Sequence, residues 1–153
     1  MLIKMIEIIS GSLYNEIREK IVQKINLDNL PLYGEKEIFK PSGDRYGKVK
    51  IKLDIERDIE KISQIKSYGE YPNAIKVNYF TYGWEVDENK LPKYFEKYIK
   101  PEIVKFIELL SIFRNNDDTV LRFSIVDGAH KDKERPLHNL AVQYALIELF
   151  KQL

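Results

Sequence analysis

The residues best suited to chemistry lie between an expected strand and an expected helix near the end of the chain. An apolar run at 120–126 predicts a buried strand. Pro136 predicts a helix start, because its missing N–H costs nothing at the first helical position. Between them lie His130, Lys131 and Asp132, where the amino end of the helix favours bound phosphate. The sequence therefore predicts an anion site here, with His130 as a catalytic candidate.

A second group of such residues follows an expected strand at 74–82. Glu85, Asp87 and Glu88 place three carboxylates within four positions, and hard oxygen ligands of this kind suit Mg²⁺. A bound metal would let Glu85 and Asp87 act as catalytic residues that activate water. The alternative is that Asp87 and Glu88 begin the next helix, where its dipole favours negative charge. The pattern leaves both interpretations open.

Composition restricts the class of protein. The chain has 153 residues, of which 44% are hydrophobic and 32% are charged, and its net charge is +1. These values indicate one globular domain spanning 1–153. With no cysteine, thiolate metal sites and cysteine nucleophiles are excluded. No apolar run is long enough to span a membrane and no signal-peptide pattern is present, so we expect a cytoplasmic protein without a membrane partner. The high Ile, Lys, Glu and Tyr content is typical of thermophiles and of A+T-rich genomes.

Hydrophobic periodicity predicts the elements that must position these residues. We expect strands at 2–9, 35–39, 46–54, 74–82 and 120–126, and helices at 12–25, 55–65, 91–113 and 136–152. The dipeptide Asp127-Gly128 is expected to end the last strand, and Pro101 to divide or restart the third helix. Strands alternating with helices predict an α/β fold with a mainly parallel sheet and helices on both faces. The segment 35–54, in which lysines alternate with apolar residues, is expected to add a small antiparallel hairpin.

Four short motifs occur in a fixed order along the chain. They are Ile8-Ile9-Ser10-Gly11-Ser12, Phe39-Lys40-Pro41-Ser42-Gly43-Asp44-Arg45-Tyr46, Ile107-Glu108-Leu109-Leu110 and Ala129-His130-Lys131-Asp132-Lys133. They resemble the SGS turn, the FPDGE-x-Y loop, the MELL helix and the ARQDK segment of ribose-phosphate pyrophosphokinase, which makes phosphoribosyl pyrophosphate. The resemblance covers roughly 3–54 and 103–150, and so only the amino-terminal half of that family. It implies a phosphoribosyltransferase-like fold.

The resemblance also implies a site for ATP at a subunit contact of a homo-oligomer. The implied nucleotide-binding residues are Phe39, Ser42, Asp44, His130, Lys131 and Asp132. Phe39 matches the ring that stacks on adenine and Asp44 a carboxylate that accepts from the base, whereas Ser42 stands where the family has aspartate. His130 and Lys131 replace an arginine and a glutamine that contact ATP. A positive charge at these positions still attracts phosphate but loses the bidentate geometry of arginine.

Three functions follow from these observations. The first is a nucleotide- or phosphate-binding domain related to the pyrophosphokinases, incomplete as an enzyme because the family's catalytic second half would begin after Leu153. The second is a small metal-dependent nuclease in which Glu85 and Asp87 hold Mg²⁺ and basic residues such as Lys133 and Arg135 hold nucleic acid. The third is a non-catalytic assembly protein with tyrosine and tryptophan side chains at a subunit contact.

Overall fold

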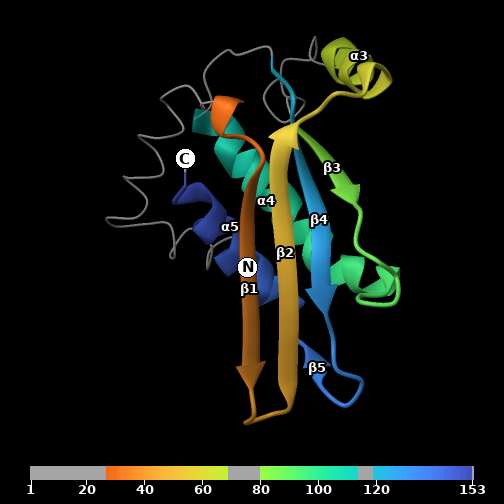
Figure 1. The fold of residues 1–153 in the computed structure, drawn as a ribbon, viewed down its shortest axis with the longest axis vertical. Coiled ribbons are helices and arrows are strands. Elements are labelled where there is room, and N and C mark those ends of the chain that lie inside the picture. Colours follow the sequence, from red (N-terminus) through yellow and green to blue (C-terminus); the bar gives the residue numbers. More distant parts are fainter. Residues whose placement is uncertain (1–26, 69–79, 114–118, 153) are drawn as a thin grey trace.

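The computed structural model describes residues 27–68, 80–113 and 119–152 (Figure 1). The predicted strand at 2–9 and helix at 12–25 lie outside these residues. The elements in chain order are η1 (Leu27–Asn29), β1 (Leu32–Lys40), β2 (Arg45–Ile55), α3 (Ile59–Tyr68), β3 (Phe80–Trp84), η3 (Lys93–Phe95), α4 (Glu96–Phe113), β4 (Leu121–Ala129), β5 (Arg135–Pro136) and α5 (His138–Phe150), where η denotes a 3-10 helix.

The strands form one mixed sheet in the order β1-β2-β4-β3, and the short β5 pairs with β2. The β1–β2 and β2–β4 pairs are antiparallel, whereas β3 runs parallel to β4. The expectation of a mainly parallel sheet with a hairpin appendage is therefore wrong, because the hairpin strand β2 is the centre of the sheet. Its alternation of lysine and apolar residues from Lys48 to Leu53 gives the strand one polar face, as antiparallel sheets have.

The helices α4 and α5 lie together on one face of this sheet, behind the strands in Figure 1. The rings of Phe106 in α4 and Phe150 in α5 have centroids 5.0 Å apart, and Phe150 also packs against Phe123 of β4 at 6.3 Å. The opposite face of β2 presents half-buried lysines, and within residues 27–68, 80–113 and 119–152 neither of the two packed helices, α4 and α5, covers it. The prediction of helices on both faces, and with it a phosphoribosyltransferase-like layering, is wrong. No helix in the part of the chain that the structure describes is long and apolar enough to cross a membrane.

Strand β4 is longer than its apolar run. It continues through Asp127 and Gly128 to Ala129, so the predicted turn at Asp127-Gly128 is wrong. The pairing with β2 extends to Lys48, with a register shift between Lys50 and Ile51. Turn-forming residues were overridden here because a neighbouring strand supplies their backbone hydrogen bonds.

The two prolines near helix starts also differ from expectation. Pro136 lies in β5, and α5 begins at His138. Pro101 lies inside α4, which runs without interruption from Glu96 to Phe113, so the prediction that it divides or restarts the helix is wrong. Pro101 is exposed, and solvent can bond the carbonyl group that its missing N–H leaves free.

Two contacts hold the fold together, one between the sheet and α5 and one among the strands of the sheet. Gly34 of β1 lies against α5, where a Cβ atom would overlap the carbonyl oxygen of Ala145. Glu56 directly follows the last residue of β2, and this residue is only 5% exposed. Its carboxylate is therefore buried. It accepts hydrogen bonds from Arg122 of β4 at 3.3 Å and from Thr81 of β3 at 2.8 Å. Buried charges require such partners, so this carboxylate joins β2, β4 and β3.

Candidate functional site at the hairpin end

The loop after β4 returns to the closed end of the β1–β2 hairpin. The N–H of Arg135 donates to the carbonyl of Asp44 at 2.6 Å, and that of Leu137 donates to the carbonyl of Tyr46 at 2.9 Å. These bonds pair β5 with β2. The segments around Phe39 and Lys131, which the sequence singled out separately, are therefore brought together at one end of the sheet.

The hairpin turn has a backbone that few residues adopt. Gly43 has φ 96° and Asp44 has φ 48°. Glycine adopts such values freely, and aspartate tolerates them better than most residues. The N–H of Asp44 closes the turn by donating to the carbonyl of Pro41 at 3.2 Å. Both Ser42 and Asp44 are exposed, so their side chains are accessible at the tip.

Lys131 lies over two aromatic rings at this end of the sheet. Its Nζ atom is 4.7 Å from the ring centroid of Phe39 and 4.5 Å from that of Tyr46. The two rings meet edge to face with centroids 6.4 Å apart. Phe39 is 49% exposed, whereas Tyr46 is buried. The site thus has an ammonium group beside an aromatic ring that is half open to solvent.

A hydrogen bond to Glu37 fixes the position of the Tyr46 ring, which lies against Lys131. The tyrosine hydroxyl donates to Oε2 of Glu37 at 2.5 Å. Burial, the hydrogen bond to Glu37 and the charge of that carboxylate together raise the pKa of Tyr46 to about 12. The phenol is therefore neutral near pH 7 and remains a donor, which holds its ring under Lys131.

His130 lies apart from this cluster, although it precedes Lys131 in the sequence. Its ring is 4.8 Å from that of Phe95 in η3, and its Nδ1 atom is 3.4 Å from the Asp132 carboxylate. His138 also contacts Phe95 at 4.8 Å. Burial lowers the pKa of His138; its hydrogen bond to a backbone carbonyl opposes this shift and His130 adds to it. His130 thus contacts Phe95 and Asp132, whereas Lys131 contacts Phe39 and Tyr46, so the two side chains do not belong to one site.

The predicted metal ligands take part in a turn that leads into η3. Oδ1 of Asp87 accepts from the N–H of Asn89 at 2.9 Å, and Oε2 of Glu88 accepts from the N–H of Lys93 at 3.1 Å. Glu85 is exposed, and its N–H donates to a β4 carbonyl. Within residues 27–68, 80–113 and 119–152, no group of three or more His, Cys, Asp or Glu side chains is placed to hold a metal ion. The Mg²⁺ site remains a prediction.

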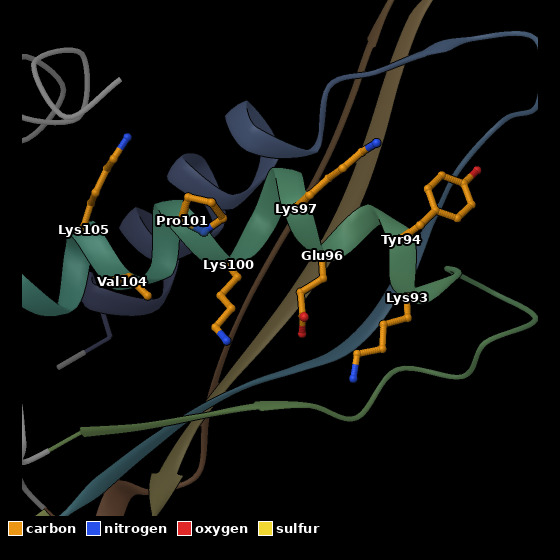
Figure 2. Close-up of a pocket in the computed structure, with 8 residues that line it drawn as sticks. All are labelled: Lys93, Tyr94, Glu96, Lys97, Lys100, Pro101, Val104 and Lys105. Carbon is orange, nitrogen blue, oxygen red and sulfur yellow. The ribbon is translucent and has the colours of Figure 1, made fainter.

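A groove of about 830 Å³ along η3 and α4 was not anticipated (Figure 2). The residues that line it, called here the α4 lysine groove, are Lys93, Tyr94, Glu96, Lys97, Lys100, Pro101, Val104 and Lys105. The available signal was the spacing of Lys93, Lys97 and Lys100, which repeats at four and three residues. Sequence reasoning used only the apolar positions of this helix.

The fold and site define a protein with two helices packed on one face of a mixed, mostly antiparallel sheet, and with a cation beside aromatic rings at one end of that sheet. Comparison with protein-family models gave no match, and comparison with curated proteins gave none either. Among solved structures, a protein of Thermus thermophilus is similar at 13% sequence identity and a TM-score of 0.43. That similarity covers 78% of this chain but only 14% of the Thermus protein. A likeness at this level supports no conclusion about fold or function.

Proposed function

We propose that this protein binds a nucleotide, or a related phosphorylated small molecule, at the hairpin end of its sheet. The observation that supports this most strongly is the position of Lys131 over Phe39 and Tyr46. A base stacks on an aromatic face, and an ammonium group attracts phosphate. The half-exposed ring of Phe39 supplies the first contact and Lys131 the second.

The charges around the tip support an anionic ligand. Lys40 and Lys133 are exposed there, and Arg135 uses two of its N–H groups on the turn while retaining others for a ligand. Within the part of the chain that the structure describes, Nζ of Lys131 contacts the rings of Phe39 and Tyr46 and forms no ion pair with a carboxylate. Its charge is therefore available to phosphate.

The Asp44 carboxylate suits the base rather than the phosphates. It lies exposed in the turn that follows β1, four residues after Lys40. An ionised carboxylate only accepts hydrogen bonds, so it favours a base with an exocyclic amino group, as adenine has. ATP, with Mg²⁺ on its phosphates, is the probe that this arrangement suggests.

Isothermal titration calorimetry with ATP, with and without Mg²⁺, tests the proposal. Lys131→Ala should weaken binding about tenfold or more, because a charge-assisted contact contributes about 1.5–3 kcal/mol. Lys36→Ala is the matched control, since its Nζ also lies over a ring, that of Tyr144 at 5.7 Å. It should bind like the parent protein. Absence of heat from the parent protein with ATP, ADP and inorganic pyrophosphate would remove the proposal.

A further inference from the structure

The α4 lysine groove concentrates positive charge that the chain as a whole lacks. It contains four lysines and one glutamate, whereas the net charge of the whole protein is +1. Figure 2 shows Lys93 and Lys100 extending to the same side of the helix as Glu96, with Lys97 on the other side. Lys105 lies 4.0 Å from the buried carboxylate of Glu102. The other three ammonium groups have no such carboxylate neighbour among the residues that the structure describes.

The one carboxylate in the groove is already bound. The hydroxyl of Tyr82 in β3 donates to Oε2 of Glu96 at 2.8 Å. Burial and this carboxylate raise the pKa of Tyr82 well above its usual value, so the phenol stays a donor. This hydrogen bond holds the Glu96 carboxylate toward the sheet; its negative charge remains, so the four lysines and one glutamate leave the groove with a net charge of +3.

Aromatic rings alternate with these lysines. Tyr94 is 60% exposed. Lys97 lies 6.0 Å from the ring centroid of Tyr94 and 5.1 Å from that of Tyr98, and Lys100 lies 5.3 Å from that of Tyr82. Grooves that combine positive charge with exposed rings bind single-stranded nucleic acid, because the charges follow the phosphates and the rings stack on bases.

The dimensions of the groove agree with such a strand. From Lys97 to Lys105 the helix rises about 12 Å, at about 1.5 Å per residue. Stacked nucleotides follow one another at about 3.4 Å along a strand, so this length matches three or four phosphates. A membrane surface is less suitable, since membrane-bound helices need a broad apolar face. The groove has only Pro101 and Val104 besides its rings.

We propose that the α4 lysine groove binds the backbone of single-stranded nucleic acid, with Tyr94 stacking on a base. This site is separate from the nucleotide site at the hairpin end, because its residues come from η3 and α4 and not from β1, β2 or the loop after β4. An acidic peptide would match the charges but would offer no base for Tyr94. That difference decides the choice of test.

Fluorescence anisotropy with labelled single-stranded RNA and DNA of about 12 nucleotides measures the binding. Two triple variants are compared: K93Q/K97Q/K100Q in the groove and K48Q/K50Q/K52Q on the lysine-bearing face of β2. Each changes the net charge from +1 to −2, since three positive charges are removed. The groove variant should bind about tenfold or more weakly, and the slope of log Kd against log salt should fall by about 2, at about 0.7 per phosphate contact. The sheet variant should retain most of the affinity.

Tyr94→Ala separates nucleic acid from an acidic peptide. It should weaken oligonucleotide binding about fivefold, the effect of one lost stacking contact. Polyglutamate should compete poorly with the oligonucleotide. Lys36→Ala, which removes one positive charge outside both proposed sites, should leave this binding unchanged. The proposal is overturned by a parent protein that binds neither oligonucleotide, by equal losses in both triple variants, or by a Tyr94→Ala protein that binds as the parent does. Tighter binding to polyglutamate or to anionic vesicles also overturns it.

Discussion

Arg135 donates two hydrogen bonds, at 3.1 and 2.9 Å, to the carbonyl oxygen of Gly43, which lies 92 residues earlier in the sequence. The acceptor belongs to the turn with positive φ angles, and the donor belongs to β5. This contact ties the tip of the hairpin to the loop that holds Lys131. The hairpin, which supplies the ring of Phe39, and the loop after β4, which supplies the ammonium group of Lys131, therefore hold each other in place.

Replacing Arg135 should weaken the site more than the fold. Arg135→Ala should lower the free energy of unfolding by about 1 kcal/mol, because its hydrogen bonds are exposed. It should reduce ATP affinity several-fold, since the hairpin tip loses its link to the Lys131 loop. Urea unfolding and calorimetry measure the two quantities. Lys151→Ala, which removes an exposed ion pair with Glu148, is the control, and an equal loss of ATP affinity there would contradict the prediction.

Asp44 should determine which base is preferred. Asp44→Asn keeps a residue that tolerates the positive φ of this position but removes the charge that favours the amino group of adenine. We expect ATP to lose its advantage over GTP in this variant. Phe39→Ala should instead weaken both nucleotides alike, because the ring stacks on either base. Competitive titration of ATP and GTP distinguishes the two patterns, and an unchanged ATP to GTP ratio in Asp44→Asn would place the base elsewhere.

The phenol of Tyr46 should ionise only near pH 12. Its pKa in the folded protein lies above the usual value of about 10, so folding favours the protonated form. The stability that this contributes is fully present below pH 10 and is lost as the pH rises toward 12. Glu37→Gln removes the charge and weakens the hydrogen bond, and should move the pKa of Tyr46 downward. Alkaline difference absorbance of tyrosinate, with Tyr46→Phe to assign the signal, measures this; a titration unaltered by Glu37→Gln would refute it.

Gly34→Ala should destabilise the protein by about 2 kcal/mol or more, the cost of forcing a methyl group into a packed contact. The added Cβ would overlap the carbonyl oxygen of Ala145, and the backbone of α5 cannot move aside as a flexible side chain would. Glu35→Ala on the same strand is the control, because that side chain is exposed, and it should change stability by less than about 0.5 kcal/mol. Urea unfolding measures the stability of both variants. Equal unfolding midpoints would contradict the prediction, because they would show that α5 moves aside without cost.

Mg²⁺ titrations test the carboxylates that follow β3. Asp87→Ala should cost about 1 kcal/mol of stability, because its side chain caps the turn at Asn89. Glu85→Ala should cost little, since that side chain is exposed. If the predicted metal-dependent nuclease is correct, Mg²⁺ should raise the melting temperature of the parent protein and not of Glu85→Ala, and Glu85→Ala should lose cleavage of nucleic acid. If Mg²⁺ does not change the melting temperature of the parent protein, the metal hypothesis is wrong and Asp87 has only its role in the turn.

Local patterns predicted strands well and predicted their arrangement badly. The alternation around Ile51 and the apolar run that contains Ile125 both indicated strands, and β2 and β4 confirm them. Nothing in either pattern shows that Ile51 pairs with Ile125. Sheet order depends on contacts between distant residues, so the hairpin was assigned to the edge although it occupies the centre.

The same limit applies to the candidate site. Phe39 was selected through the family resemblance and Lys131 through its loop between an expected strand and an expected helix, but their contact depends on the return of β5 to β2. His130 was grouped with Lys131 because the two are adjacent in sequence, and the structure places His130 against Phe95 instead. Adjacent residues of an extended segment point in opposite directions, which adjacency in the sequence does not reveal.

The position of β4 between β2 and β3 has a consequence for how the chain acquires its structure. In the described sheet, β3 pairs only with β4, and Trp84 meets its partner Ile125 after a long excursion through α4. Closing the β1–β2 hairpin costs little loop entropy, because its turn is short. Strand β3 can pair only after the distant residues of β4 have been synthesised. We therefore expect the hairpin to form early during synthesis and β3 to lack its partner strand until β4 has left the ribosome. Refolding of the whole chain should accordingly be limited by the insertion of β4, and substitutions at Phe123 should slow it more than substitutions in the hairpin turn.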